Sequence, residues 1–140
     1  GLDLSPNYTK KAAALVKSWP HAEVIEGQAE AMPLADASQD VIVSIYLFHE
    51  LPPRVRPLVA QEIARVLKPG GTFIFADSLQ FGDTPELDGL LEYFPEGFHE
   101  PYYKHYLSED FASIFGGVAL FPSAPEAVFL TKIQKWTKPE

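Results

Sequence analysis

The sequence predicts an α/β domain in which helices flank a mostly parallel sheet and an antiparallel hairpin closes the C-terminus. Two observations support this prediction. Strand-like and helix-like segments alternate along most of the chain, which is the order that parallel sheets with crossover helices produce. Residues 40–48 (DVIVSIYLF) are also almost continuously apolar, as expected for a central strand that is buried on both faces. The 140 residues are enough for one domain.

The first predicted helix begins at Ser5 and Pro6, a favourable N-cap followed by a favourable first helical position. It is expected to end before Pro20, and its apolar residues recur at helical spacing: Tyr8, Ala12, Leu15 and Trp19. Residues 23–27 (EVIEG) are short and β-branched and are predicted to form a strand that precedes the strong strand at 40–48.

A second helix is expected after Pro52-Pro53 and should extend to about Lys68. Its buried stripe is predicted at helical spacing, in Val55, Val59, Ile63 and Val66. Residues 69–71 (PGG) should stop this helix, and residues 72–76 (TFIFA) are predicted to form another apolar strand.

The C-terminal part differs in composition. Residues 77–107 are rich in Phe, Tyr, Pro, Glu and His, with one short helix expected near 86–93. Ser108 is predicted to cap a helix that ends at Gly116-Gly117. The tail, residues 118–136, is expected to fold as a hairpin around residues 123–125.

The acidic composition restricts the partners. A formal net charge of −8 and a pI near 4.9 disfavour nucleic acid as a main substrate. The absence of cysteine excludes disulfides, thiolate metal sites and a Cys nucleophile. No apolar segment is long enough to cross a bilayer. We therefore expect a cytoplasmic protein that acts on a small molecule.

Four segments, taken in order, resemble the class I S-adenosylmethionine-dependent methyltransferases that act on small molecules. They are residues 1–6 (GLDLSP), 26–34 (EGQAEAMPL), 38–43 (SQDVIV) and 65–73 (RVLKPGGTF). They are similar to the end of the family's second strand, the loop after its third strand, its fourth strand and the junction before its fifth strand. The resemblance implies a Rossmann-like fold that lacks its first strand and helix, because the glycine-rich turn of the family would precede Gly1.

The resemblance implies that S-adenosylmethionine is the cofactor. An acidic residue at the carboxyl end of a strand can accept hydrogen bonds from both ribose hydroxyls, which is the role implied for Asp3. The remaining implied contacts are Leu4, Gln28, Ala29 and Glu30 around the adenine, and Tyr46, Leu47 and Phe48 along the methionine. The alternatives are a carboxylate placed at a helix N-terminus for Asp3, a polar surface turn for residues 28–30, and core packing for Leu4.

The acceptor side is predicted from residues that follow two strands. His49 is a candidate general base, and Glu50 is expected to orient it or to bind the acceptor. The alternative is a loop-capping histidine beside a solvated glutamate. The acceptor pocket is predicted to contain Asp77, His99, Glu100, Tyr102 and Tyr103, although an aromatic structural loop explains these residues equally well. Their spacing does not favour a metal site, and none is predicted.

The sequence thus favours methyl transfer to a small or lipophilic acceptor, with the chain itself impaired as a fragment. One alternative is a non-catalytic, truncated module that serves as an interaction or packing unit. Its exposed strand edge at 41–46 would then favour self-association as a dimer. A nicotinamide-dependent oxidoreductase of similar topology is a further alternative, although the 65–73 junction and the 26–34 loop favour the methyltransferase.

Overall fold

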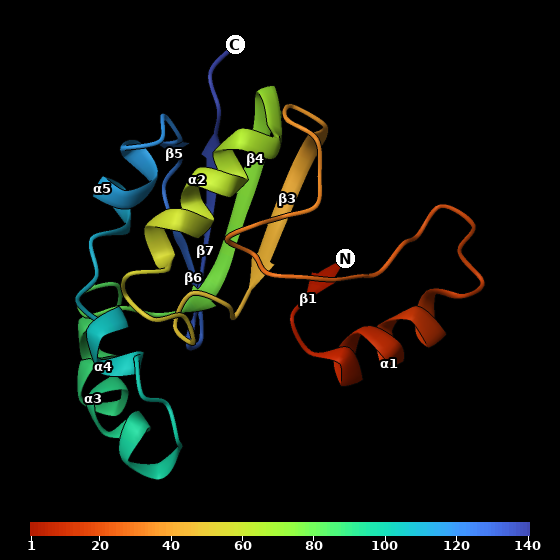
Figure 1. The fold of residues 1–140 in the computed structure, drawn as a ribbon. Helices are drawn as coiled ribbons and strands as arrows, with labels where there is room; N and C mark the ends of the chain where they lie inside the picture. Colours follow the sequence, from red (N-terminus) through yellow and green to blue (C-terminus); the bar gives the residue numbers. More distant parts are fainter.

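The computed structural model describes residues 1–140 as two units that stand side by side (Figure 1). The smaller one, called here the N-terminal unit (residues 1–27), holds two short parallel strands joined by a helix. Its elements are β1 (Leu2–Asp3), α1 (Pro6–Val16) and β2 (Ile25–Glu26). Ser5 caps α1 as predicted, since its hydroxyl accepts a hydrogen bond from the Tyr8 amide.

The main unit is a five-stranded sheet. Its single parallel ladder joins β3 to β4, while β7 runs antiparallel to β4 and carries two short antiparallel strands on its other side. The elements are β3 (Gln39–Ile45), β4 (Leu67–Ser78), β5 (Phe121–Pro122), β6 (Glu126–Val128) and β7 (Thr131–Thr137). The predicted α/β class, with flanking helices and antiparallel C-terminal strands, is confirmed.

The helices of the main unit gather on one face and at one end of this sheet (Figure 1). α2 (Arg56–Val66) lies across the face with α5 (Phe111–Gly116) beside it. The others lie near the end where β3 and β4 finish, in the order η1 (Pro85–Leu87), α3 (Asp88–Gly97) and α4 (Tyr103–Tyr106). No helix is both long enough and apolar enough to span a membrane.

An aromatic cluster forms the centre of the core between α5 and the sheet. The Phe115 ring lies 4.9–5.8 Å, centroid to centroid, from five neighbours: Phe48, Phe73, Phe75, Phe111 and Trp136. α2 adds the predicted stripe, with Val59, Ile63 and Val66 buried and Val55 half-buried.

The predicted stop at residues 69–71 is a bulge at the start of β4. Gln39 of β3 pairs with Leu67 of β4, and Val41 pairs with Thr72, so β4 advances five residues where β3 advances two. Gly70 adopts a positive φ of 74°, and a Cβ at Gly71 would lie 2.7 Å from the carbonyl oxygen of Lys68. α2 has already ended at Val66, and the two glycines serve the bulge inside β4, because glycine tolerates this backbone path.

The prediction that the 40–48 strand is buried on both faces is wrong. Val41, Val43 and Ile45 on one face of β3 are 52–67% exposed, because α2 covers the opposite face and no helix of this chain covers theirs. The strand also ends earlier, at Ile45, because Tyr46 turns into the left-handed region with a φ of 51°.

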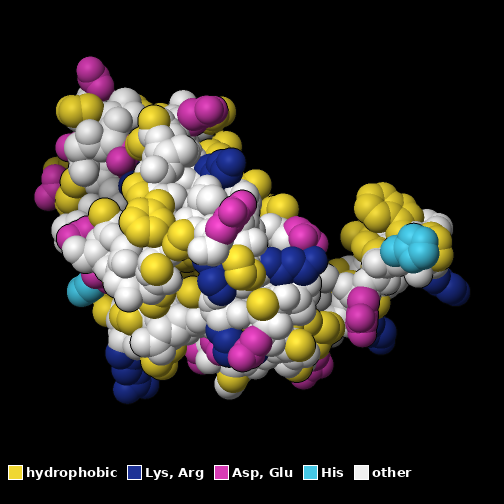
Figure 2. All heavy atoms as spheres, turned by 90° about the horizontal axis from the view of Figure 1, so that it is seen from above, with side chains coloured by type: hydrophobic (Ala, Val, Ile, Leu, Met, Phe, Trp, Pro, Cys, Tyr) yellow, Lys and Arg dark blue, Asp and Glu magenta, His cyan; other side chains and the backbone are white.

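The apolar spacing predicted for the first helix does not mark a buried stripe. Tyr8, Leu15 and Trp19 are all more than 60% exposed, and α1 packs only against β1 and β2. Figure 2 shows the N-terminal unit as a separate lobe with hydrophobic side chains exposed at its tip. The periodicity therefore predicted the helix correctly. It did not indicate whether another element of the chain covers the apolar side of that helix.

Two predictions about the C-terminal third need correction. α5 is capped by Asp110 rather than Ser108, since the Asp110 carboxylate accepts the Ser113 amide at 2.9 Å. The tight hairpin turn lies at Phe129-Leu130, where Phe129 has a φ of 53°, and not at residues 123–125. Residues 123–125 instead connect β5 to β6, and both of these strands pair with β7.

Replacing Phe115 by alanine tests the aromatic cluster. We expect Phe115→Ala to lower the free energy of unfolding by about 3–5 kcal/mol, because it opens a cavity among five rings. Phe129→Ala is the matched control, since Phe129 is 79% exposed and should cost much less. Urea unfolding of both variants measures this difference, and equal losses would contradict a core centred on Phe115.

Candidate functional site

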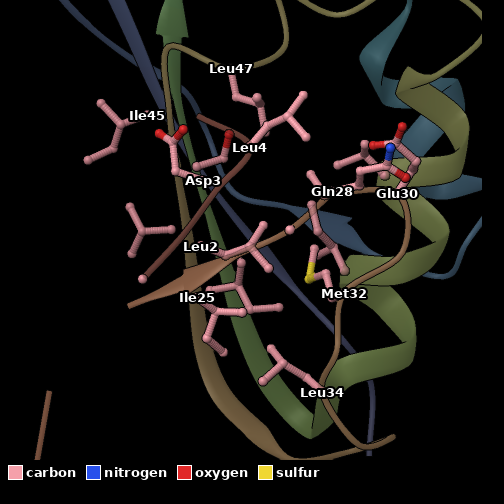
Figure 3. A pocket seen from close by; sticks show the side chains of 18 of the residues that line it. Leu2, Asp3, Leu4, Ile25, Gln28, Glu30, Met32, Leu34, Ile45 and Leu47 are labelled. Atoms are coloured by element: carbon pink, nitrogen blue, oxygen red, sulfur yellow. The ribbon is translucent and has the colours of Figure 1, made fainter. Parts of the chain in front are cut away.

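A cleft of about 1240 Å³ lies between the N-terminal unit and the main sheet. Its walls come from β1, β2 and residues 28–34 on one side and from β3 and the start of α2 on the other. Figure 3 shows side chains from both sides converging on this space. The lining is mostly hydrophobic, with polar groups at the carboxyl ends of the strands, which is the usual composition of a small-molecule site.

Asp3 lies at the carboxyl end of β1 and lines the cleft. Its Oδ1 accepts the Ser5 amide at 2.7 Å, which fixes the carboxylate beside the N-terminus of α1. This contact agrees with the alternative reading of Asp3 as a helix N-terminal carboxylate. It also leaves Oδ2 free to accept hydrogen bonds from a ligand.

Residues 28–34 form the part of the cleft rim that lies next to α2, and this helix holds them in place. Gln28, Ala29 and Glu30 line the cleft as part of this rim. The Met32 amide donates to Glu62 at 2.8 Å, and Arg65 donates to the carbonyl oxygens of Met32 and Leu34 at 3.0 and 2.8 Å.

Glu62 and Arg65 were not identified from the sequence as residues that support the cleft. Their i, i+3 spacing is typical of an ion pair on one helix face, which they form at 2.7 Å. The spacing gives no sign that the same two side chains hold a loop some thirty residues earlier in the chain. Their hydrogen bonds to that loop exist because the two segments meet in the fold.

The segment after β3 joins the cleft to a second, buried group of side chains. Tyr46 and Leu47 line the cleft, and Leu4 lies on the other side of it, two-thirds exposed. Phe48 does not line the cleft, because its side chain is fully buried in the aromatic core. The prediction of a ligand contact for Phe48 is therefore corrected to a structural role at this turn.

His49 and Asp77 form a buried pair at the carboxyl ends of β3 and β4. His49 Nδ1 lies 2.6 Å from Asp77 Oδ1. Asp77 also accepts the amides of Phe48 and Ser78, each at 2.8 Å, and it is fully buried. Asp77 therefore lies behind His49 rather than on a surface that an acceptor could contact.

The other predicted acceptor residues are distributed unevenly around His49. Glu50 Oε1 lies 4.0 Å from His49 Nε2 and is largely exposed. The Tyr103 ring packs edge-on to His49 at 5.8 Å, and its hydroxyl hydrogen-bonds to Ser78. Glu100 is half-buried near His49, whereas His99 is exposed. No three His, Asp or Glu side chains come together in a way that could hold a metal ion.

Arg56 is a buried residue that the sequence did not single out. Its Nε donates to the Phe48 carbonyl oxygen at 3.0 Å, and its other nitrogens donate to Glu109 and to the carbonyl oxygen of Tyr102. Its side chain is fully buried. Arg56 thus ties the turn after β3 to the segment that carries Tyr103, and only its position after Pro52-Pro53 at a helix start could have drawn attention to it.

The pKa of His49 is raised above its ordinary value of 6.5. Burial is the largest influence and lowers the pKa, because it disfavours the charged imidazolium. The hydrogen bond to Asp77 and the negative charges of Asp77, Glu100 and Glu50 together outweigh burial. For Tyr103 the main influence is burial, which raises the pKa of its hydroxyl.

The fold and the cleft are those of a Rossmann-like α/β domain, a class in which ligands bind beyond the carboxyl ends of the parallel strands. Residues 1–75 match the family described as "Methyltransferase domain". Because this match covers more than half of the chain, the chain belongs to that methyltransferase family. The family suggested by its four sequence segments is therefore confirmed.

Individual relatives agree with this assignment. The chain is 34% identical over 77 residues to an uncharacterized methyltransferase of Synechocystis, covering 55% of this chain and 35% of the relative. It is 29% identical over 115 residues to a demethylmenaquinone methyltransferase of Lysinibacillus sphaericus, covering 82% and 44%. The chain thus spans less than half of the length of either relative.

A solved structure confirms the fold class. An S-adenosylmethionine-dependent methyltransferase from Methanosarcina mazei superposes with a TM-score of 0.73 at 16% identity. The match covers 99% of this chain and 81% of that chain. At this low identity the likeness describes the fold.

The raised pKa of His49 makes the stability of the fold depend on pH. The folded state binds a proton at His49 more tightly than the unfolded state does, so this stabilisation is fully present below about pH 6.5 and is lost as the pH rises through the folded-state pKa. We expect the difference in free energy of unfolding between wild type and His49→Gln to shrink as the pH rises through the folded-state pKa of His49. His99→Gln, at an exposed histidine, should show no such trend in urea unfolding at a series of pH values.

Proposed function

We propose that this protein transfers a methyl group from S-adenosylmethionine to a small or lipophilic acceptor. The observation that carries the proposal is the cleft whose polar groups lie at the ends of β1, β2 and β3, directly beside the buried His49–Asp77 pair. Membership of the methyltransferase family supports the reaction type. The cofactor supplies a methyl carbon that is electrophilic because it is bonded to a sulfonium.

The residues of the cleft fit an adenosine-containing ligand. Asp3 offers a free carboxylate oxygen for ribose hydroxyls, and the Gln28 amide carries both a donor and an acceptor for an adenine edge. Leu4 and Met32 provide apolar surface for the ring (Figure 3). Ser44 also lines the cleft, and its buried hydroxyl has no hydrogen-bond partner within the chain. We assign Ala29 and Glu30 to the adenine side, and Tyr46 and Leu47 to the methionine side.

We assign the acceptor to residues 77–107, a segment outside the lining of the cleft that packs Tyr103 against His49. Three aromatic rings stack there, with Phe94 4.6 Å from Phe98 and 5.0 Å from Tyr103 between centroids. Such a wall suits an apolar or aromatic acceptor. The name of the Lysinibacillus relative, a demethylmenaquinone methyltransferase, supports a lipophilic one. His49 serves as the base, while Glu50, Glu100, His99 and Tyr102 border the acceptor.

We also propose that the 140-residue chain by itself binds the cofactor weakly. The cleft volume of about 1240 Å³ exceeds the 300–1,000 Å³ that is common for small-molecule sites. Leu4 and Tyr46, on opposite walls, are 66% and 46% exposed, so neither wall closes on a ligand. A ligand held on such open walls keeps much of its contact with water and gains less binding energy.

Titration of S-adenosylhomocysteine tests the assignment of Asp3. We expect weak binding to the wild-type chain and an affinity roughly 10- to 150-fold lower for Asp3→Asn, because hydrogen bonds to a charged group contribute about 1.5–3 kcal/mol. Asp40→Asn is the matched control, since Asp40 is an exposed carboxylate at the opposite end of β3. The titration is followed by NMR, because changes in chemical shift can be measured even when binding is weak. Unchanged affinity in Asp3→Asn, or no shifts at millimolar ligand, would contradict the proposal.

The exposed side of β3 favours a second candidate function, that of an interaction or packing module that associates with a second copy. β3 pairs with β4 on one edge and has no strand partner on the other. Val41, Val43 and Ile45 add an exposed apolar stripe to this free edge. Two copies related by a twofold axis can join such edges as one antiparallel sheet, and we propose that the chain dimerises in this way.

A charge on this stripe should abolish the dimer. We expect a concentration-dependent dimer for the wild type and a monomer for Val43→Glu, because pairing would bury an uncompensated carboxylate. Val128→Glu is the control, at a valine of similar exposure on β6. Light scattering after size-exclusion chromatography distinguishes these states at micromolar concentration. A wild-type monomer, or a dimer that survives Val43→Glu, would reject the β3 interface.

A further inference from the structure

The carboxylate of Asp77 is saturated by donors from its own chain. Oδ2 accepts the Phe48 amide, while Oδ1 accepts the Ser78 amide and lies 2.6 Å from His49 Nδ1. The residue is fully buried, so no acceptor molecule touches it. Because an ionised carboxylate can only accept hydrogen bonds, His49 Nδ1 must be the donor of this contact.

This contact decides which nitrogen of His49 can accept a proton. With the neutral imidazole protonated at Nδ1, the lone pair lies on Nε2, on the opposite side of the ring. Nε2 lies 4.0 Å from the exposed Glu50 carboxylate, and the His49 residue keeps 9% of its surface exposed. The reactive nitrogen therefore lies on the side of the ring next to the exposed Glu50, and Asp77 lies on the opposite, buried side.

The remaining surroundings of His49 are aromatic or acidic. Tyr46, Tyr103 and Tyr106 place their ring centroids 5.8–6.1 Å from that of the imidazole, nearly perpendicular to it. The negative charges of Glu50 and Glu100 also act on the ring. The Tyr103 and Tyr106 hydroxyls are bonded to Ser78, so neither hydroxyl competes for Nε2. No cation contacts the imidazole, because Arg56 is engaged with Glu109 and lies over Tyr106.

We infer that Asp77 is a positioning residue that holds His49 with Nε2 free to take a proton from a weakly acidic hydroxyl group of the acceptor. This inference deepens the proposed methyl transfer and rests on it. The O–H bond of the acceptor breaks, an N–H bond forms at Nε2, and the electron pair stays on the acceptor oxygen. The resulting imidazolium is paired with the Asp77 carboxylate and returns its proton to water through the exposed edge of the ring.

The chemistry of the base favours a hydroxyl over an amine. A neutral amine has a nucleophilic lone pair before it loses any proton, whereas a hydroxyl becomes a strong nucleophile only as its proton leaves. A buried carboxylate–imidazole pair is therefore useful for the hydroxyl and dispensable for the amine. The aromatic wall of Phe94, Phe98 and Tyr103 further suits a hydroxyl carried on an aromatic ring.

NMR of the imidazole nitrogens tests the positioning role on the chain as it exists. The protein has four histidines, and His49→Gln identifies the His49 signals by their loss. In the wild type we expect the neutral imidazole to carry its proton on Nδ1. In Asp77→Asn we expect the His49 pKa to fall and the proton to shift towards Nε2. Glu50→Gln is the control, and its effect on the pKa should be clearly smaller.

The acceptor class is tested with 4-nitrophenol, whose phenolate form absorbs visible light. We expect the wild-type chain to raise the phenolate fraction at a pH near the probe's own pKa, and His49→Gln to abolish this rise. An unchanged spectrum with the wild type would overturn the hydroxyl assignment.

A proton on Nε2 of neutral wild-type His49 would overturn the positioning role of Asp77, and this measurement does not depend on whether Asp77→Asn folds. An unchanged His49 pKa in a folded Asp77→Asn variant would overturn it as well. Cofactor binding is measured separately through Asp3, which lines the cleft and does not belong to the His49–Asp77 pair. Failure of the His49–Asp77 pair as a base is thus distinguishable from failure of the methyltransferase proposal itself.

Discussion

The site depends on the way that Phe48 is held. Its ring is fully buried among Phe73, Phe75, Phe111 and Phe115, its amide donates to Asp77 and its carbonyl oxygen accepts from Arg56. Because the side chain and both backbone polar groups are satisfied, the turn after β3 has little freedom. The neighbours of Phe48 are then directed away from the aromatic core, Leu47 into the cleft and His49 towards the buried Asp77. A core residue therefore connects the two halves of the candidate site.

The strain at Tyr46 follows from the same anchoring. A bulky residue with a φ of 51° is uncommon and costs free energy, so neighbouring contacts must hold it in place. The Tyr46 amide donates to the Ala76 carbonyl oxygen at 2.8 Å, and its hydroxyl is bonded to Thr131. The strand ends at this residue because the chain turns away there, and the turn brings both cleft and base residues to the carboxyl ends of β3 and β4.

Some elements could be predicted because their signals are local. Ser5-Pro6 sets a helix start through its own hydrogen bonding, and Pro-Gly-Gly at 69–71 excludes a helix from that stretch, where the chain forms a bulge of β4. His49 was identified as a candidate base because it directly follows a strong strand. The orienting group could not be identified in this way, because Glu50 is adjacent in sequence, while the carboxylate that reaches Nδ1 belongs to Asp77, 28 residues later.

The sequence by itself determined the α/β class, the order of most elements and the family, because periodicity, caps and short motifs act over a few residues. Tertiary structure decided which faces are covered, which side chains turn inward and which carboxylate meets His49. The physical reason is that burial and hydrogen-bond pairing depend on distances between segments far apart in the chain. Val43 and Phe48 lie in one apolar run, yet Val43 is half exposed and Phe48 fully buried, since only the packing of α2 and α5 distinguishes their surroundings.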